Sequence, residues 1–241
     1  MDSTKTPALA VDNLPFTALA AMVYDPMRAF ALLEQRRAAW LPLLIVVTTS
    51  VALLMWYYAV VDFDWLKEKM VAIIPEVEKR EQAMAMVSKG VIEWSSIIAS
   101  AVGIPIIAAI TGLYFMLAAK VMKVDFSFGK GFALAAWGTL PTAVTSIIGY
   151  IQLMLTTNGQ LDFSQLNPLS VNQLVFQYEV GSTWASFLDT LNLGTGLSIL
   201  LMICGFQVWA KVSRASAAVV TLLPCIVILG IWIAINMSKV A

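Results

Sequence analysis

The sequence contains no histidine, and charged residues make up only 12% of its 241 positions. Histidine is the commonest general base near neutral pH and a frequent metal ligand, so its absence excludes His-based catalytic triads and the usual zinc motifs. Average soluble domains carry about 25% charged residues, a level that this chain does not approach. Because 15 Lys and Arg balance 15 Asp and Glu, the net charge favours neither nucleic acid nor an acidic ligand as a partner.

Cysteine is also scarce. Only Cys204 and Cys225 occur, both inside apolar runs, which is typical of small packing residues rather than of a disulfide or a metal site. The segment Met1–Asn13 contains no apolar block with a cleavage site, so no cleaved signal peptide is expected. Asp62 and Asp64 suit a solvated helix start better than acid–base catalysis. The sequence therefore predicts no enzyme activity, no cofactor and no metal.

What the chain does contain is apolar sequence, since 60% of its residues are hydrophobic and its mean hydropathy is +0.82. About 20 helical residues cross a hydrocarbon core of about 30 Å, and five apolar runs approach or exceed that length. We therefore predict an all-α, polytopic membrane protein with five transmembrane helices plus amphipathic surface helices. The expected parts are a cytoplasmic N-terminal segment, 1–37, and a membrane domain, 38–241, with spans at about 40–61, 95–120, 132–155, 193–210 and 217–237.

Basic residues in the connections predict the orientation. The side with the N-terminus holds Lys5, Arg28, Arg36, Arg37, Lys120, Lys123, Lys130, Lys211 and Arg214, and the other side holds Lys67, Lys69, Lys79, Arg80, Lys89 and Lys239. The long connection Thr156–Asn192, on the second side, has no Lys or Arg. By the positive-inside rule the first side is cytoplasmic, so we expect the N-terminus inside and the C-terminus outside.

A short helix is expected before the first span. Asp25 suits its N-cap and Pro26 its first position, where a missing N–H costs nothing. Phe30 belongs to its apolar side, while Arg36 and Arg37 crowd its end. Such a helix either lies in the membrane surface or packs on the bundle from the cytoplasmic side. These five residues form the candidate surface-helix set.

The two outer connections carry helix signals of their own. In the first, Asp64 is the expected cap of one helix, and a second helix over Glu76–Lys89 is expected to end at Gly90. In the second, Ser170 is the expected cap of a short helix over Val171–Val180. Both connections are therefore expected to be ordered.

The span interiors hold almost no ionisable residue, which argues against a proton- or ion-coupled pump. They hold instead small or weakly polar residues and prolines, which allow close helix contact, kinks, or a polar path. The candidate set for helix packing or a ligand path is Gly103, Pro105, Thr111, Gly138, Pro141, Thr145, Ser146, Gly149, Gly196, Ser198 and Gly205. Close packing is the simpler explanation. A ligand path would require a cavity that reaches the midplane near Pro105, Thr145, Ser146 and Ser198.

Several stretches together resemble one known family. They are Tyr24–Phe30, Arg36–Pro42, Phe126–Phe132 leading to Ala135–Pro141, Leu166–Ser170, and Phe187–Leu193 with the later turn Ser213–Ala215. In this order and spacing the chain resembles the Ypt-interacting protein (YIP) family of five-span membrane proteins with a cytosolic N-terminus. Its short N-terminal tail is most similar to the bacterial branch. The resemblance implies the fold, the topology, a bacterial inner-membrane location, and association with itself or with other membrane proteins.

The leading functional hypothesis is a non-enzymatic membrane protein of the YIP type that organises membranes or assembles partners through protein–protein and protein–lipid contacts. Its expected partners are membrane lipids and either further copies of itself or other membrane proteins, and nucleic acid is not expected. The alternative is a carrier or channel-like protein for a lipid or neutral solute that uses the Gly/Pro-interrupted second and third spans. The two hypotheses differ in whether those spans enclose a cavity.

Overall fold

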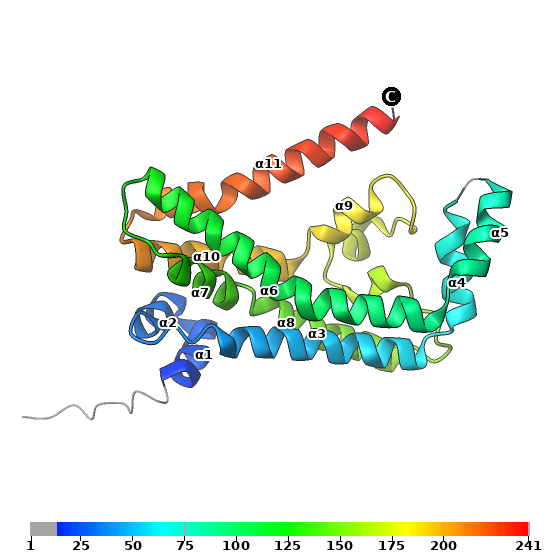
Figure 1. The fold of residues 1–241 in the computed structure, drawn as a ribbon, viewed down its shortest axis with the longest axis horizontal. Coiled ribbons are helices and arrows are strands. Elements are labelled where there is room, and N and C mark those ends of the chain that lie inside the picture. Colours follow the sequence, from blue (N-terminus) through cyan, green and yellow to red (C-terminus); the bar gives the residue numbers. More distant parts are fainter. Residues whose placement is uncertain (1–13, 75, 241) are drawn as a thin grey trace, which may run out of the picture.

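The structure is a computed structural model that describes residues 14–74 and 76–240 (Figure 1). Its regular elements in these ranges are helices, and one isolated bridge joins Ser170 to Asn192. The elements are α1 (Leu14–Tyr24), α2 (Pro26–Leu33), α3 (Trp40–Val60), α4 (Phe63–Ala72), α5 (Val77–Met86), α6 (Lys89–Val121), α7 (Phe128–Gly138), α8 (Pro141–Leu155), η2 (Phe163–Leu166), η3 (Asn172–Phe176), α9 (Ala185–Thr190), α10 (Leu193–Ala210) and α11 (Arg214–Val240).

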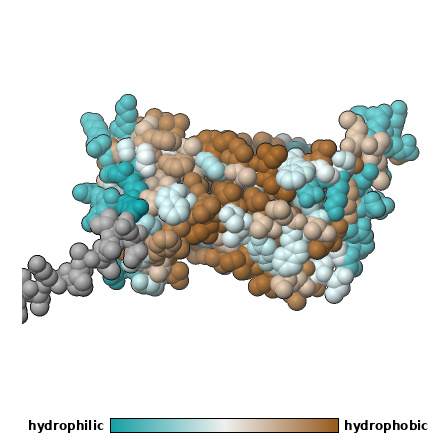
Figure 2. Space-filling model, turned by 60° about the horizontal axis from the view of Figure 1, so that its bottom comes forward, coloured by the Kyte–Doolittle hydropathy of each residue, from teal (hydrophilic) through white to brown (hydrophobic). Residues whose placement is uncertain are grey.

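Five stretches are long and apolar enough to cross a membrane, namely α3, α6, α7 with α8, α10 and α11. In the space-filling view a hydrophobic belt separates two hydrophilic ends, which is the surface pattern that a bilayer requires (Figure 2). The predicted all-helical fold with five candidate spans is confirmed.

The two hydrophilic ends are built from different elements (Figure 1). One end, called the basic end below, holds α1, α2 and the turns that join α6 to α7 and α10 to α11. The other, called the loop end, holds α4, α5 and residues 156–192.

Two expectations at the loop end need correction, one on a helix cap and one on a helix length. Asp62 rather than Asp64 caps α4, because the Asp62 carboxylate accepts the Trp65 N–H at 3.2 Å. Ser170 does cap the next turn, accepting the backbone N–H three residues on at 3.2 Å. The helix predicted after it is shortened to η3, because Gln177 adopts a left-handed backbone with φ of 54°.

The helix that contains the second predicted span, 95–120, begins before it, at Lys89. Ser88 caps α6 by accepting the Val91 N–H at 3.4 Å. The helix expected over 76–89 therefore ends at Met86, and Gly90 lies in the first turn of α6 instead of ending α5. The resulting helix has 33 residues, more than the about 20 that cross a hydrocarbon core.

The third span is divided in two at its proline. α7 ends at Gly138, and Pro141 takes the first position of α8, where its missing N–H leaves no hydrogen bond unmade. Pro105 and Pro224, by contrast, lie inside α6 and α11 without ending them.

The N-terminal hairpin of α1 and α2 is folded onto the basic end. Asp25 caps α2 by accepting the Arg28 N–H at 3.0 Å. Phe30 is fully buried and meets Trp209 of α10 edge to face, with ring centroids 5.3 Å apart. The indole Nε1 of Trp209 also donates to the Phe30 carbonyl at 2.7 Å. Of the two arrangements expected for this helix, α2 shows the packed one.

Two hydrophobic cores hold the bundle together. The core at the basic end includes Phe30, Leu33, Phe115, Leu134, Trp137, Phe206 and Trp209. The core nearer the loop end includes Leu53, Leu54, Tyr57, Leu66, Ile97, Leu153 and Leu166. The first core ties α2 to α6, α7 and α10, and the second ties α3 to α4, α6, α8 and η2.

The last helix departs from the bundle (Figure 1). α11 packs on α10, and Tyr114 of α6 donates its hydroxyl to the Val220 carbonyl at 2.6 Å near the start of α11. Only 6% of the apolar window of α11 is buried, against 56% for α7 with α8. Most of the surface of α11 is therefore free to contact lipid or another membrane protein.

Candidate functional site

The predicted site residues are spread over four helices. Gly103, Pro105 and Thr111 lie on α6, Gly138 on α7, Pro141, Thr145, Ser146 and Gly149 on α8, and Gly196, Ser198 and Gly205 on α10. They do not converge on one point. The structure divides them into close helix contacts, open positions and residues that line a cavity.

Three candidate glycines lie where a neighbouring element leaves no room for a side chain. A Cβ added to Gly138 would lie 2.9 Å from the Met202 Cε atom, and one added to Gly205 would lie 2.6 Å from the Phe30 ring. At Gly149 the obstacle is the Leu166 carbonyl oxygen, at 2.7 Å. These glycines allow α7 to approach α10, α10 to approach α2, and α8 to approach η2.

The tightest helix crossing involves two glycines outside the predicted set. A Cβ on Gly112 would lie 2.5 Å from the Phe132 nitrogen, and one on Gly131 would collide with the Gly112 carbonyl. The backbones of α6 and α7 are therefore in direct contact at this point. A signal for it exists in the sequence, because the two helices are joined by a short turn and each carries a glycine near it. Gly103 and Gly196, by contrast, have no atom within 4 Å of an added Cβ.

Thr145 and Ser146 line a wide-mouthed cavity of about 480 Å³, called the chamber below, that lies among α3, α6, α8 and the loop end. Its polar lining is Ser50, Ser96, Ser100, Thr142, Thr145, Ser146, Asn167 and Asn192, and its apolar lining is Leu53, Leu54, Ala99, Phe163 and Leu166. The volume falls in the range of about 300–1,000 Å³ that is typical of small-molecule sites. Pro105 and Ser198, which a ligand path was also expected to include, do not line this chamber.

The hydroxyl groups of α8 donate to their own helix. Thr142 Oγ1 donates to the Thr139 carbonyl at 2.6 Å, and Thr145 Oγ1 donates to the Thr142 carbonyl at 2.7 Å. Ser146 Oγ donates to the same Thr142 carbonyl at 3.1 Å. A hydroxyl that donates its proton in a hydrogen bond still has lone pairs that can accept another one. These three oxygens can therefore accept hydrogen bonds from a molecule in the chamber.

The two asparagines of the chamber differ in how far they are satisfied. Asn192 caps α10 by accepting the Thr195 N–H at 2.8 Å, and it donates to the Thr190 carbonyl at 3.3 Å. Asn167 donates to the Asp189 carbonyl at 3.1 Å, but its Oδ1 is buried and has no partner within the described chain. Leaving a buried acceptor unpaired costs about 1–3 kcal/mol. Asn167 Oδ1 is thus an unpaired acceptor, but it has almost no accessible surface and is not presented to the chamber.

Two further cavities continue the chamber toward the loop end. The nearer one, of about 400 Å³, shares Ser96 and Phe163 with the chamber. Its wall includes Tyr58, whose hydroxyl lies 3.0 Å from Ser96 Oγ in a hydrogen bond. The outer one, of about 290 Å³ and called the vestibule below, shares Lys69 and Asp162 with the middle cavity. The shared walls place the three cavities in a row that leads from the loop end into the bundle.

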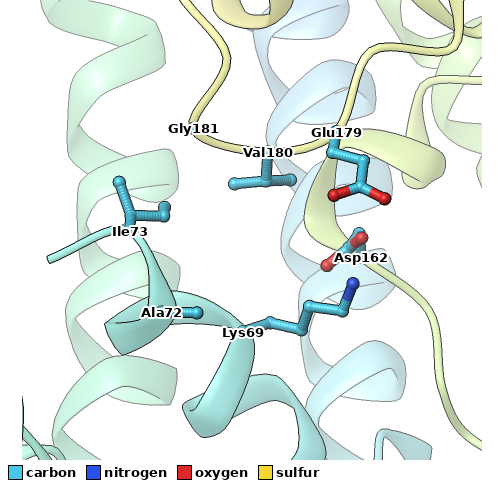
Figure 3. Close-up of a pocket in the computed structure, with 7 residues that line it drawn as sticks. All are labelled: Lys69, Ala72, Ile73, Asp162, Glu179, Val180 and Gly181. Carbon is cyan, nitrogen blue, oxygen red and sulfur yellow. The ribbon is translucent and has the colours of Figure 1, made fainter. Parts of the chain in front are cut away.

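The vestibule is charged, unlike the chamber. In Figure 3 the Lys69 ammonium points toward Asp162, and Glu179 lies beside them. Burial raises the pKa of Asp162, the positive charge of Lys69 opposes that rise, and the negative charge of Glu179 adds to it. One cation thus faces two acids at the mouth of the row.

Metal binding has no support in the described parts of the chain. Residues 14–74 and 76–240 contain no group of three or more Cys, Asp or Glu side chains placed to hold an ion. Cys204 and Cys225 are free thiols on α10 and α11.

Five apolar helices between two hydrophilic ends define a multi-pass α-helical membrane protein. The family model of the Yip1 domain matches residues 20–235, which is most of the chain. The protein therefore belongs to the Yip1 domain family, as the sequence resemblance implied. No curated protein and no solved structure matches the chain.

Proposed function

We propose that this protein is a non-enzymatic, membrane-organising protein that binds lipid, with the headgroup of a membrane lipid in the chamber and its acyl chains in the bilayer. The observation that carries the proposal is the chamber, a space of about 480 Å³ lined by hydroxyl and amide groups together with apolar side chains, whose helices belong to the membrane-spanning set. Polar groups at membrane depth are tolerated where they face protein or a filled cavity. The headgroup of a surrounding membrane lipid is a polar group that could fill this cavity.

The helix faces beside the chamber suit acyl chains. Val102 follows Ser100 by two residues on α6, and Ile147 follows Ser146 directly on α8. Each of these two apolar side chains is 52% exposed, so each faces out of the bundle. A lipid with its headgroup in the chamber can thus keep its tails on an apolar surface.

The close packing of the core at the basic end favours lipid binding over transport of a ligand through the bundle. Phe115, Trp137 and Phe206 are almost completely buried there, and the α6 and α7 backbones touch at Gly112 and Gly131. The alternative of a carrier is favoured by the same chamber. It would require α6 and α7 to part at this glycine contact so that the ligand could leave at the basic end.

The orientation and the partners are part of the proposal. The basic end is placed in the cytoplasm of a bacterial cell and the loop end outside, because the connection from Thr156 to Asn192 carries no Lys or Arg. The outward apolar surface of α11 supports association with a second copy or with another membrane protein, because only 6% of its apolar window is buried within the chain.

Native mass spectrometry of the full chain, released from lipid nanodiscs, tests lipid binding. We expect the wild type to retain lipid, and we expect Ser146→Phe to retain about tenfold less because the new ring fills the chamber. Ile226→Phe is the control, since it places the same ring on the outward face of α11, at a side chain that is 64% exposed and lines none of the cavities, and it should retain lipid as the wild type does. Ser100→Phe fills the chamber from α6 and should act like Ser146→Phe.

Circular dichroism and size-exclusion elution establish that each variant is folded. Equal lipid retention by the wild type and by folded Ser146→Phe and Ser100→Phe would refute lipid binding in the chamber.

Cysteine labelling tests the orientation in a background with both native cysteines replaced by alanine. Thr157→Cys at the loop end should react with a membrane-impermeant maleimide in intact cells. Ala215→Cys at the basic end should react only after the membrane is permeabilised. The opposite pattern would contradict the orientation.

A further inference from the structure

We infer that the group held in the chamber is uncharged and rich in hydroxyls, as in the sugar or glycerol headgroup of a neutral lipid. This inference rests on the proposed lipid binding and names the ligand class of the same site. Three features of the cavities carry it, namely the charge of the chamber wall, the hydrogen-bonding character of that wall, and the charge of the vestibule.

The chamber wall has no charge. None of its lining residues is ionisable, since the polar ones are serine, threonine and asparagine and the others are apolar. A phosphate or an ammonium group placed there would lose part of its hydration and find no counter-charge in the wall, which is unfavourable. Phospholipid headgroups all carry a phosphate, so the wall disfavours them as a class.

The α8 side of the wall offers acceptors. Three hydroxyls donate to backbone carbonyls and therefore have only lone pairs left for a ligand, namely those of Thr142, Thr145 and Ser146. A phosphate oxygen is itself an acceptor and cannot pair with these groups. A sugar or glycerol hydroxyl donates to them and needs no counter-charge.

The vestibule reinforces the same selection. Asp162 and Glu179 lie in its wall with Lys69 as the one cation among its lining residues. An anionic headgroup that approaches from the loop end meets this acidic excess before it reaches the chamber, and like charges repel. A neutral headgroup meets no such barrier.

A competition experiment in nanodiscs tests the inference. The full chain is placed in a phosphatidylethanolamine bilayer that contains equal small amounts of glucosyl diacylglycerol and phosphatidylglycerol, and the bound lipid is identified by native mass spectrometry. We expect glucosyl diacylglycerol to be enriched over each phospholipid by about tenfold or more. The double variant Thr145→Val/Ser146→Ala removes two acceptors at nearly constant shape and should lower that enrichment about fivefold or more.

Thr139→Val is the matched control for the double variant. Thr139 Oγ1 makes the same kind of bond, donating to the Ala136 carbonyl at 2.9 Å, but it does not line the chamber. Its enrichment should equal that of the wild type.

The outcomes separate the two proposals. Retention of phosphatidylglycerol or phosphatidylethanolamine that Ser146→Phe abolishes, without enrichment of the glycolipid, would overturn the headgroup inference and leave lipid binding in place. Lipid retention that no chamber variant alters would overturn both. Methyl glucoside added at millimolar concentration distinguishes the source of the sugar, because its binding in place of any lipid would support the polyol chemistry and overturn the lipid.

Discussion

Replacing Gly112 by alanine should weaken the bundle, whereas the same replacement of Gly103 on the same helix should strengthen it slightly. The new Cβ on Gly112 would lie 2.5 Å from the Phe132 nitrogen and 2.7 Å from its Cα atom. Both obstacles are backbone atoms that cannot rotate away, so α6 and α7 must move apart. At Gly103 no atom lies within 4 Å, so the methyl group meets only open space.

The magnitude follows from the two effects that alanine brings. Replacing a helical glycine by alanine gains about 0.5–1 kcal/mol, because the unfolded chain loses conformational freedom. That gain applies equally at both positions. Overpacking a close contact costs about 1–3 kcal/mol, and this cost applies at Gly112 alone. The free energies of unfolding of the two variants should therefore differ by about 1–3 kcal/mol, with Gly103→Ala the more stable.

Reversible unfolding in mixed micelles, followed by tryptophan fluorescence, measures this difference. A Gly112→Ala variant as stable as Gly103→Ala would refute the direct backbone contact between α6 and α7. It would also remove the argument that this core is closed at the basic end.

Three further predictions concern single contacts. Trp209→Phe removes the donor to the buried Phe30 carbonyl and should lower the free energy of unfolding by about 1–3 kcal/mol. Trp94→Phe, at a side chain that is 61% exposed, is the control and should have almost no effect. Equal effects of the two variants would contradict the anchoring of α2 by Trp209. The folded protein raises the pKa of Asp162 above its ordinary value of 3.8, so the wild type loses stability as the pH rises from about 3.8 through the raised pKa. Asp162→Asn does not titrate in that range, so its free energy of unfolding relative to the wild type should increase with pH there. A pH-independent difference would contradict the burial of that carboxyl. Ser127→Ala removes the cap of α7, which accepts the Lys130 N–H at 3.3 Å, and should cost about 0.5–2 kcal/mol in the same unfolding measurement; no loss would argue against that cap.

The spans were predictable because crossing hydrocarbon demands a minimum apolar length. α10 begins and ends at the predicted residues, 193 and 210, because Asn192 caps it and Lys211 follows it in a left-handed conformation. The predicted span 95–120 lies inside α6, whose first turns carry Lys89 and Glu93; the sequence assigned these charged residues to the connection. A helix that extends past the bilayer tolerates such residues, so hydropathy alone does not mark its start.

The chamber could be predicted only in part. Thr145 and Ser146 stood out as polar residues in an apolar run, and their place in the wall follows from α8. Ser96 and Ser100 share one face of α6 at a four-residue spacing, a signal that was available. Asn167 shows no such signal, because its local sequence is that of an ordinary turn. Its role depends on how residues 156–192 fold back over the bundle, and that is a tertiary property.

The pattern of glycines had a similar limit. A sequence shows that Gly103 and Gly112 lie on one helix, but not which of them faces a neighbour. Gly112 meets Gly131 because the short turn after α6 returns α7 alongside it, whereas Gly103 faces outward. Small residues therefore mark candidate contacts, and the arrangement of the helices selects among them.

The central claim is that the chamber among α3, α6 and α8 holds a neutral lipid headgroup. Electron cryo-microscopy of the full chain in nanodiscs that contain glucosyl diacylglycerol tests it most directly, with a rigid fragment bound to the loop end to aid alignment. The account predicts density for a sugar between Ser100 and Ser146, within hydrogen-bonding distance of Thr145 Oγ1, and tails along Val102 and Ile147. A map in which α6 and α8 close on each other, or in which the open chamber is empty, would contradict it.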